Sequence, residues 1–590
     1  MISSSGAPRR AHNGGSSGRA PLRLAAALRE TFAEGYSGRD LRADLLAGAV
    51  VGVVALPLSM ALAIAVGVPP QHGLYTAIVA GVVIALFGGS RVQVSGPTAA
   101  FVAVLAPITA TYGVGGLLLA TLMAGAILIV LAVSGLGKLI ELVPYPVTTG
   151  FTAGIGIVIA ILQVRDALGL TVEAWPESTL EKTVELARAL PTVRIADAGV
   201  AALTLAILLL WPRFQKSIPA PLVALTVAGI SAALLARFAP DLAVATIRDR
   251  FSSEVGGVVV AGIPRALPLP VLPWSLPGAD GAPLGLTWDL IRALLPAAGA
   301  IAVLGAIESL LSAVVADGMT RRQHDPDAEL FAQGLGNLVA PFFGGIAATG
   351  AIARTATNVR SGARSPIAAI AHAAVLLLAV LALAPLLGYL PMSALAALLL
   401  VVAWTMSDAP HVARTLRTAP RSDVAVLLVC LALTVVFDMV LAIGVGIVLA
   451  ALLFMRRMAA VSSVRILGEH HPEADRPVPP GMLVYEVAGP LFFGAAARAM
   501  RALATTSAHV RVVLIDLRAV PAMDATGQVN LASAVERLRH AGISVVVAGI
   551  ASQPLRTLLR AGWQRRGERL SIHRSFEQGF EAAVRVAEGG

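Results

Sequence analysis

Long apolar runs alternate with short polar connections between residue 45 and about residue 455. The pattern predicts about fourteen membrane segments, several of them shorter than the roughly 20 residues that a full crossing needs. The first run, Leu45 to Val66, contains Pro57, where we expect the helix to break. The expected segments are 45–66, 74–88, 97–110, 115–134, 147–164, 198–211, 219–237, 292–316, 331–341, 351–360, 366–385, 391–406, 422–437 and 440–455.

One stretch, residues 342–366, interrupts this series without being apolar enough to cross a membrane. Small residues from Gly344 to Gly350 favour an extended backbone, and a helix can run from about Ala351 to Asn358. A helix that begins inside the bilayer leaves its first backbone N–H groups unpaired, at the positive end of its dipole. Such an end is tolerated where it lines a cavity that holds something negative. The stretch therefore predicts an anion site.

A second stretch has the same character. Residues 92–96, VQVSG, alternate like an extended segment and lead to Pro97, a residue favoured in the first turn of a helix. The two half-helices are third in a first set of seven segments and third in a second set. They arrive from opposite sides, so we expect their starts to meet, as in an inverted repeat. The alternative is two full spans with kinks, since proline and glycine are common in membrane helices.

Positive charge between the runs indicates the orientation. Basic residues follow the even-numbered segments, whereas the short odd connections contain no lysine or arginine. Basic loops face the cytosol, so both termini are expected there. The composition, rich in arginine and alanine with few lysines, is typical of a GC-rich bacterial gene, which makes the inner (plasma) membrane the expected location. The basic residues are Arg91, Lys138, Arg213 with Lys216, Arg321 with Arg322, Arg360 with Arg364, Arg414 with Arg417, and Arg456 with Arg457.

Composition excludes several classes of protein. With 57% hydrophobic and 14% charged residues and a mean hydropathy of +0.80, the chain is too apolar for a soluble protein. The net charge of +10 is spread along the edges of apolar runs, so no nucleic-acid partner is expected. The single cysteine, Cys430, excludes a disulfide within the chain. No nucleophile with a base, metal-ligand cluster or phosphate-binding loop is evident, so we expect neither an enzyme nor a cofactor.

Several long motifs resemble the sulfate permease family of anion transporters, also called solute carrier family 26. They are residues 44–81, residues 92–101 (VQVSGPTAAF), residues 307–320 (IESLLSAVVADGMT) and residues 348–366. The resemblance covers nearly the whole chain. It implies a polytopic α-helical membrane protein with a seven-plus-seven inverted-repeat fold, divided into core and gate domains. It also implies an anion site between the third and tenth helices, elevator-type alternating access and a homodimer.

The resemblance carries the family's anion site onto residues beside the break in the first helix and at the two half-helix starts. Some relatives have a hydroxyl residue in place of Ile352, so backbone N–H groups and Thr98 must supply more of the contacts. Arg354 is the cationic side chain expected near the anion; the alternatives are that it reaches the cytosolic boundary or pairs permanently with Glu308. The site residues are Leu58, Ser59, Leu62, Thr98, Ala99, Gly350, Ala351, Ile352 and Arg354.

A carboxylate in the middle of an apolar span is costly and is typical of a functional group. Glu308 and Ser312 are four residues apart, on one face of a helix, and could coordinate a cation or pass a proton. Related transporters place their coupling acid here. Loss of water favours the protonated carboxyl group, so we expect coupling to protons, with sodium as the alternative.

After Met458 the pattern becomes that of a small soluble α/β domain. Residues 512–527, VVLIDLRAVPAMDATG, resemble the sulfate-transporter and anti-sigma-factor-antagonist (STAS) domain. In soluble relatives a hydroxyl residue in the place of Thr526 can be phosphorylated, next to the acid Asp524; the alternative is a cap for the following helix. The expected elements are strands 482–487, 510–517 and 543–548 and helices 526–540 and 553–560. The expected division is a disordered tail (1–40), a transporter domain (41–458), a linker (459–480) and a STAS domain (481–590).

The expected function is secondary active transport of a small anion, sulfate or a related oxyanion or carboxylate, coupled to protons. Three alternatives within transport stay open: sodium-coupled carriage of bicarbonate or a C4-dicarboxylate, an uncoupled anion channel, and a nucleobase carrier of similar fold. The last suits Arg354 and two helix starts less well. Outside transport, the alternative is a membrane-anchored signalling protein whose active part is the C-terminal domain.

Overall fold

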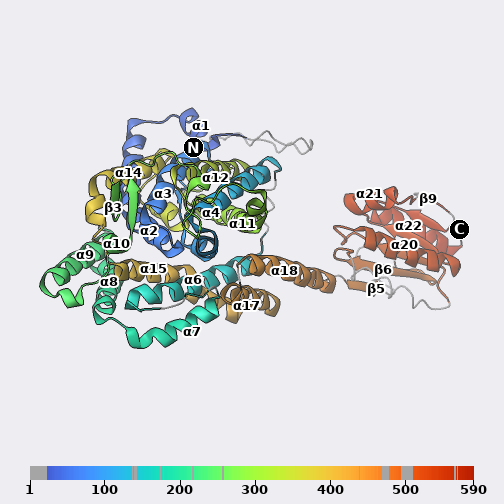
Figure 1. Ribbon diagram of the computed structural model, residues 1–590. Coiled ribbons are helices and arrows are strands. Elements are labelled where there is room, and N and C mark those ends of the chain that lie inside the picture. Colours follow the sequence, from blue (N-terminus) through green and yellow to red (C-terminus); the bar gives the residue numbers. More distant parts are fainter. Residues whose placement is uncertain are drawn as a thin grey trace. The chain divides into compact units, whose positions relative to one another are not determined.

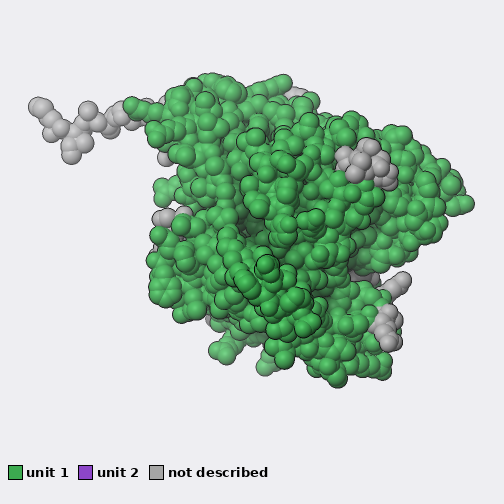
Figure 2. Space-filling view, turned by 60° about the vertical axis from the view of Figure 1, so that its left-hand side comes forward, with its two compact units in different colours: residues 1–447 green, residues 448–590 purple. Residues whose placement is uncertain are grey.

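The computed structural model describes residues 23–135, 137, 143–172, 175–176, 178–215, 218–255, 258–437, 439–461, 463–467, 477–492, 509–563, 566–567 and 569–589. The chain forms two compact units, Met1–Ile447 and Val448–Gly590. The first unit is helical and is shown as a space-filling surface in Figure 2, and the second is a small α/β unit (Figure 1).

Apolar helices make up the first unit. Within the described residues, ten helices are long and apolar enough to cross a membrane, judged by length and composition. Together with the shorter helices α12, α13 and α17 they account for each expected segment. The helices that correspond to these segments are α2 (Gly38–Val66), α3 (Pro70–Phe87), α4 (Ala99–Val133), α6 (Tyr145–Leu168), α8 (Ile195–Phe214), α9 (Ala220–Phe238), α11 (Trp288–Thr320), α12 (Pro326–Val339), α13 (Ile352–Arg360), α14 (Ile367–Leu387), α15 (Met392–Ser407), α17 (Arg421–Val436) and α18 (Met439–Val461).

Helix α4 contains two expected segments joined at a bend. The backbone leaves the helical conformation at Gly113, where φ is 69° and ψ is −172°. Glycine is needed there, both for this positive φ and because a Cβ atom would lie 2.4 Å from the carbonyl carbon of Gly278. The expected segments 97–110 and 115–134 are therefore two helices on either side of Gly113.

The expected break of the first helix at Pro57 is wrong. Helix α2 continues from Gly38 to Val66 with Pro57 inside it. Proline lacks the N–H that would bond to the carbonyl of Val53, but a single missing bond does not end a helix that is packed on several sides. Helices α3, α13 and α14 all pack against α2. The tertiary contacts therefore override the local preference.

The expectation of a disordered tail as far as residue 40 is wrong for the residues that the structure describes. Helix α1 (Ala26–Ala33) follows residue 25, and α2 already begins at Gly38. The amides of Ala25 and Ala27 donate to the carbonyls of Phe87 and Gly88, at 3.1 and 3.3 Å. Residues 1–22 lie outside the described residues.

Ion pairs attach this N-terminal segment to the rest of the unit. Arg91 pairs with Glu30 and Glu34, and Arg322 pairs with Glu34 at 3.0 Å. Hydrogen bonds from Arg91 and then from Arg322 lower the pKa of Glu34 to about 2. Arg364 pairs with Asp40 at 2.6 Å. The structure thus brings Arg91, Arg322 and Arg364 to the same side of the unit, as the alternation of basic loops predicts.

Helix contacts in the first half of the chain are repeated in the second. Helix α4 packs on α11 and α12 as α14 packs on α2 and α3, and α15 packs on α8 as α6 packs on α17. Exchanging each helix for its counterpart in the other half reproduces the same contacts, which is the property of an inverted repeat. Two groups result: α2, α3, α4, α11, α12, α13 and α14 in one, and α6, α8, α9, α15 and α17 in the other (Figure 1).

The longer connections carry small elements of their own. Helix α7 (Thr179–Ala189) lies between α6 and α8, and α16 (Ala409–Thr418) lies between α15 and α17. Helix α10 (Ile247–Arg250) and the antiparallel strands β2 (Ser252–Val255) and β3 (Val258–Ala261) lie between α9 and α11.

The second unit is a six-stranded sheet with helices on both faces. The strand order is β5-β6-β7-β8-β10-β9, in which β6, β7, β8 and β10 run parallel. Its elements are β5 (Ser463–Leu467), β6 (Met482–Ala488), β7 (Val512–Asp516), α20 (Ala525–His540), β8 (Ser544–Ala548), α21 (Ser552–Arg560), β9 (Arg566–Gly567), β10 (Leu570–Ile572) and α22 (Phe576–Glu588). The expected strands and helices of this domain are confirmed. The expected linker from 459 to 480 is wrong at residues 463–467, because β5 pairs with β6.

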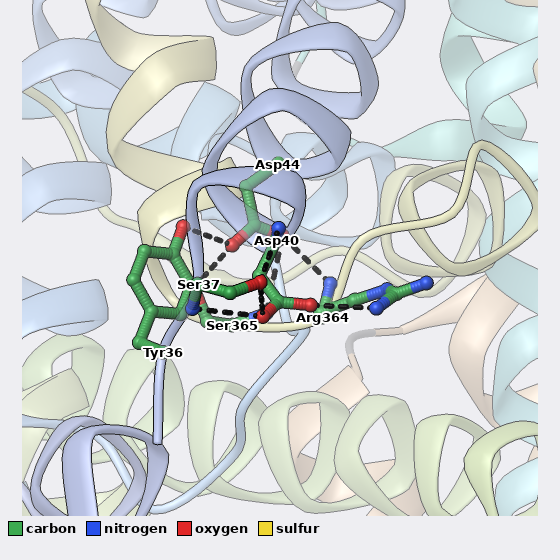
Figure 3. A network of polar contacts seen from close by, with 6 residues as sticks. All are labelled: Tyr36, Ser37, Asp40, Asp44, Arg364 and Ser365. Carbon is green, nitrogen blue, oxygen red and sulfur yellow. Dashed lines mark hydrogen bonds and ion pairs between the residues drawn. The ribbon is translucent and has the colours of Figure 1, made fainter.

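A polar network fixes the start of α2 against the connection between α13 and α14 (Figure 3). Asp44 is fully buried and accepts hydrogen bonds from the Tyr36 hydroxyl (2.8 Å), from the backbone N–H of Arg364 (2.7 Å) and from the N–H and hydroxyl of Ser365. Burial, followed by the bond to Asp44, raises the pKa of Tyr36 to about 12, so its hydroxyl stays a donor. The network therefore holds the C-terminal end of α13 in place.

Replacing Asp44 with Asn should destabilise the protein. The amide of the variant would turn N–H groups toward groups that now donate hydrogen bonds to Asp44. Each buried donor left without an acceptor costs about 1–3 kcal/mol. We expect a lower apparent melting temperature for the purified protein in detergent, measured by intrinsic fluorescence. Asp40→Asn is the matched control, because its amide oxygen can still accept from Ser37 and its ion pair with the exposed Arg364 is worth little. Equal melting temperatures for both variants would contradict this role.

Candidate functional site

The starts of the two half-helices are joined by backbone hydrogen bonds. Strands β1 (Ser95–Gly96) and β4 (Thr349–Gly350) pair antiparallel, with Ser95 opposite Gly350 and Gly96 opposite Thr349. The amide of Ala351 also donates to the carbonyl of Val94, at 2.9 Å. Since α4 and α13 begin within three residues of these strands, their N-terminal ends lie together. The prediction that the two starts meet is confirmed.

Small residues make this close approach possible. A Cβ atom on Gly350 would lie 1.9 Å from Nε2 of Gln93, and a Cβ atom on Gly96 would lie 2.5 Å from Nη1 of Arg354. Side chains from outside the strand pair therefore occupy the space that any larger residue would need. The glycines therefore allow the backbones of both helix starts to lie close together.

Arg354 lies inside the protein beside this junction. Its side chain is 2% exposed, and Nη2 donates to the carbonyl of Pro97 at 2.6 Å. Among the described residues, Nε and Nη1 have no hydrogen-bond partner and the guanidinium makes no ion pair. The two alternatives for Arg354 are therefore not what the structure shows: it neither reaches the boundary nor pairs with Glu308.

Glu308 is linked to the other half-helix. The hydroxyl of Thr98, the residue just before α4, donates to Oε2 of Glu308 at 2.6 Å and does not cap its own helix. Ser312 has a different partner: its hydroxyl donates to Thr355 Oγ1 at 3.1 Å. The two residues share a face of α11, but α4 contacts one and α13 the other. Thr98 is thus the residue that the structure brings to the expected coupling acid.

The remaining predicted residues divide into accessible and buried groups. Leu58, Thr98 and Glu308 are partly exposed, and Ile352 is 42% exposed. These four side chains come from α2, the start of α4, α11 and α13, and the Thr98 hydroxyl joins the start of α4 to Glu308. The other predicted binding residues are buried: Ser59, Leu62, Ala99, Gly350, Ala351 and Arg354.

A cavity of about 500 Å³ lies beside α11. Its apolar wall includes Ile307 and Leu311, the neighbours of Glu308 on the helix, and its polar end includes Asp317 and His324. A second cavity of about 490 Å³ shares that polar end and is also lined by residues of the N-terminal segment. The lining residues of these two cavities do not include Thr98 or Ile352, so both cavities lie beside the site and not at it.

Sequence reasoning missed a buried acid behind the strand pair. Glu329, in the first turn of α12, accepts hydrogen bonds from Gln93 and Gln333. Its position resembles that of an ordinary acidic residue favoured by a helix dipole. The signal in the sequence was a carboxylate three residues after Pro326, followed by an apolar, glycine-containing stretch. This pattern does not distinguish a buried carboxylate that organises other side chains from an ordinary acidic residue at a helix start.

The regulatory candidates lie in the second unit. Asp524 is the N-cap of α20 and accepts the amide of Gly527 at 2.6 Å. Thr526 is exposed in the first turn of the same helix. The cap alternative therefore describes Asp524, whereas phosphorylation of Thr526 stays a prediction.

Comparison with known proteins identifies the family. Residues 41–430 match the Sulfate permease family, and residues 473–576 match the STAS domain. The chain belongs to the sulfate permease family. As a sulfate permease family protein, it is a multi-pass membrane transporter of anions with a C-terminal STAS domain.

Two relatives have names that specify an anion. A putative sulfate transporter of Bacillus subtilis is 38% identical over 533 residues, which cover 90% of this chain and 95% of the relative. The bicarbonate transporter BicA of Picosynechococcus is 31% identical over 547 residues, covering 88% of this chain and 90% of the relative.

Solved structures of this family have the same fold. The transmembrane domain of a cyanobacterial BicA is 29% identical and aligns with a TM-score of 0.57, covering 70% of this chain and 98% of that chain. Murine solute carrier 26 member A9, in its inward-facing state, aligns with a TM-score of 0.80 over 96% of this chain and 94% of that chain, at 16% identity. The sulfate permease protein described here thus has the seven-plus-seven inverted-repeat fold expected from its sequence.

Proposed function

We propose that this protein is a secondary active transporter that carries sulfate or a chemically similar small anion across the plasma membrane, coupled to protons. The observation that supports the substrate class most strongly is the juxtaposition of two helix N-termini with the buried guanidinium of Arg354. Each element alone is compatible with other ligands, but together they favour a compact anion.

Electrostatics explains why this junction suits an anion. The first amides of α4 and α13 are unpaired within their helices, and each helix start carries about half a positive charge. Arg354 adds a full charge whose Nε and Nη1 groups have no protein acceptor among the described residues. An uncompensated buried charge costs several kcal/mol, and a bound anion would offset that cost.

Glu308 connects the proposed anion site to a proton. Its carboxylate accepts a hydrogen bond from the hydroxyl of Thr98, which lies at the start of α4. When Glu308 takes up a proton, its negative charge is removed from beside the anion and Thr98 is free to donate to the anion instead. Proton and anion therefore bind more strongly together than separately, which is the condition for symport.

The two helix groups supply the moving parts of the proposal. The site lies within the group that contains α4 and α13, and among the described residues contacts of α2 with α15 and α9 and of α4 with α6 join this group to the other. The cavity beside α11 faces α6 of the second group at Thr148. We infer that the first group moves as a core against the second as a gate, with cytosolic termini and a homodimer as the family implies.

Uptake measurements test the proposal directly. Purified protein in proteoliposomes should accumulate radiolabelled sulfate when an inward proton gradient is imposed, and unlabelled sulfate should compete better than chloride or a C4-dicarboxylate. Assays at two external pH values, with and without sodium, separate the coupling ions. Uptake that never exceeds protein-free liposomes would contradict transport, and conductance without accumulation would indicate a channel.

Sodium-coupled bicarbonate transport is the second candidate. The similarity to BicA of Picosynechococcus over most of both chains favours it, and Glu308 with Thr98 offers two oxygen atoms to a sodium ion. Sodium-dependent uptake of labelled bicarbonate, with sulfate failing to compete, would select this candidate in the same assay.

A further inference from the structure

Glu329 is a buried carboxylate that the transport scheme above does not use. It is 1% exposed and receives five hydrogen bonds, none of them from a cationic side chain among the described residues. The donors are the backbone N–H groups of Gly89 (3.1 Å) and Ser90 (3.2 Å), Nε2 of Gln93 (3.0 Å), the hydroxyl of Ser309 (3.3 Å) and Nε2 of Gln333 (3.1 Å).

These bonds lead directly to the strand pair. Nε2 of Gln93 also donates to Ser309 Oγ at 2.9 Å, and the same nitrogen fills the space beside Gly350. Nε2 of Gln333 also donates to Ser95 Oγ at 3.0 Å. Since Ser95 and Gly350 are paired across the two strands, Glu329 acts on both strands through one glutamine each.

The orientation of the two glutamines shows what Glu329 imposes. The amide oxygens of Gln93 and Gln333 are buried and have no hydrogen-bond partner among the described residues, whereas both nitrogens are fully used. Both amides are therefore turned to present N–H groups to one acceptor. Both glutamines and Ser309 donate to Oε1 of Glu329, whereas the amides of Gly89 and Ser90 donate to Oε2. A carboxylate accepts on both oxygens, whereas a Gln or Asn side chain would turn an N–H group toward one of these two sets of donors.

We propose that Glu329 is a positioning residue for the anion site: it sets the orientation of Gln93 and Gln333 and so holds β1 and β4, and the helix starts that follow them, in binding geometry. This inference rests on the proposed function for its transport readout. It assigns Glu329 no contact with the anion and no share in moving the proton.

A charge-exchange pair of variants tests the inference. Glu329→Gln places an amide N–H group against donors, so we expect the KM for sulfate uptake to rise at least about tenfold. Gln93→Glu alone sets two carboxylates against each other and should do the same. In the double variant an amide at 329 can donate to a carboxylate at 93 while its oxygen still accepts from Gly89 and Ser90. The Gln333 amide can then turn so that its oxygen accepts from the new N–H group and from the Ser95 hydroxyl. The double variant should return to within about threefold of the wild-type KM.

Hydrogen–deuterium exchange gives a readout that does not depend on transport. In Glu329→Gln, the peptides that cover residues 92–97 and 346–352 should exchange faster, because the backbone hydrogen bonds between β1 and β4 open more often. The double variant should restore protection. Glu185→Gln, which removes a carboxylate of α7 that pairs with Arg188 of the same helix, is the control and should change neither KM nor exchange in these peptides.

The outcomes separate the two proposals. If wild-type protein takes up neither sulfate nor bicarbonate, the proposed function fails, and the exchange data alone decide the role of Glu329. If Glu329→Gln keeps both the wild-type KM and the wild-type exchange, or if the double variant shows no rescue, the inference is overturned. Should Glu329→Gln not fold, Ser309→Ala replaces it: loss of one donor should raise KM a few-fold and speed exchange in residues 92–97, and no change would overturn the inference.

Discussion

Replacing Arg354 with Ala should raise the dissociation constant for sulfate at least about thirtyfold, because removing one partner of a buried, hydrogen-bonded charge pair typically costs about 2–5 kcal/mol. The guanidinium is buried, uses Nη2 for the Pro97 carbonyl and keeps Nε and Nη1 without a protein acceptor. The measurement is the KM of uptake, together with the stabilisation of purified protein by added sulfate. An unchanged KM would show that Arg354 does not contribute to sulfate binding.

Stability in the absence of sulfate separates this role from a structural one. An unpaired buried charge is unfavourable, so Arg354→Met, which keeps most of the side-chain volume, should melt at the same temperature as the wild type or higher when no anion is present. The variant should, however, gain no stability from sulfate. Arg354→Lys is the matched control: it keeps the charge without the planar fork and should bind with intermediate affinity. A variant that is already unstable without sulfate would indicate a structural role.

Replacing Glu308 with Gln should uncouple uptake from the proton gradient. The amide imitates the protonated carboxyl group in size and charge, so the anion can still bind, but no proton is taken up or released. We expect sulfate exchange to persist while the extra uptake driven by an inward proton gradient disappears. The measurement compares labelled sulfate uptake with and without the gradient in the same proteoliposomes.

Thr98 supplies the control for the Glu308 variant. Thr98→Ala removes the hydroxyl that bonds to Glu308 but leaves the carboxyl group, so it should weaken sulfate binding and keep the dependence on the gradient. Gradient-driven uptake at the wild-type level in Glu308→Gln would show that the proton binds elsewhere. Uptake in the wild type that follows sodium instead would favour bicarbonate-type coupling.

The sequence predicts the helices well because burial in lipid demands long apolar runs wherever the chain crosses. It also predicts the two half-helices, because glycine and proline near Gly350 and Pro97 conflict with a continuous span. The local rule fails at Pro57, where packing on three sides carries the helix past one missing hydrogen bond. It also fails for α1, because eight residues are too few to show a helical period of apolar positions, although Ala26 and Ala27 are buried.

The side-chain partners are the part that the sequence does not provide. Glu308 and Ser312 share a helix face, yet Ser312 bonds to Thr355, 43 residues further along the chain. Gln93 and Glu329 are separated by 236 residues, and nothing in either local sequence indicates the other. Such pairs depend on how the two repeats interlock, which periodicity and spacing do not encode.

The junction of Ser95 with Gly350 has a consequence for how the protein is made. Residue 350 emerges from the ribosome only after more than half of the chain has been synthesised, so the first helix tip must wait in the membrane with its amides unsatisfied until the second arrives. Long-range closures of this kind form late. During insertion the unpaired backbone amides of the nascent chain are therefore exposed to misfolding at the place where the mature protein is proposed to bind its anion.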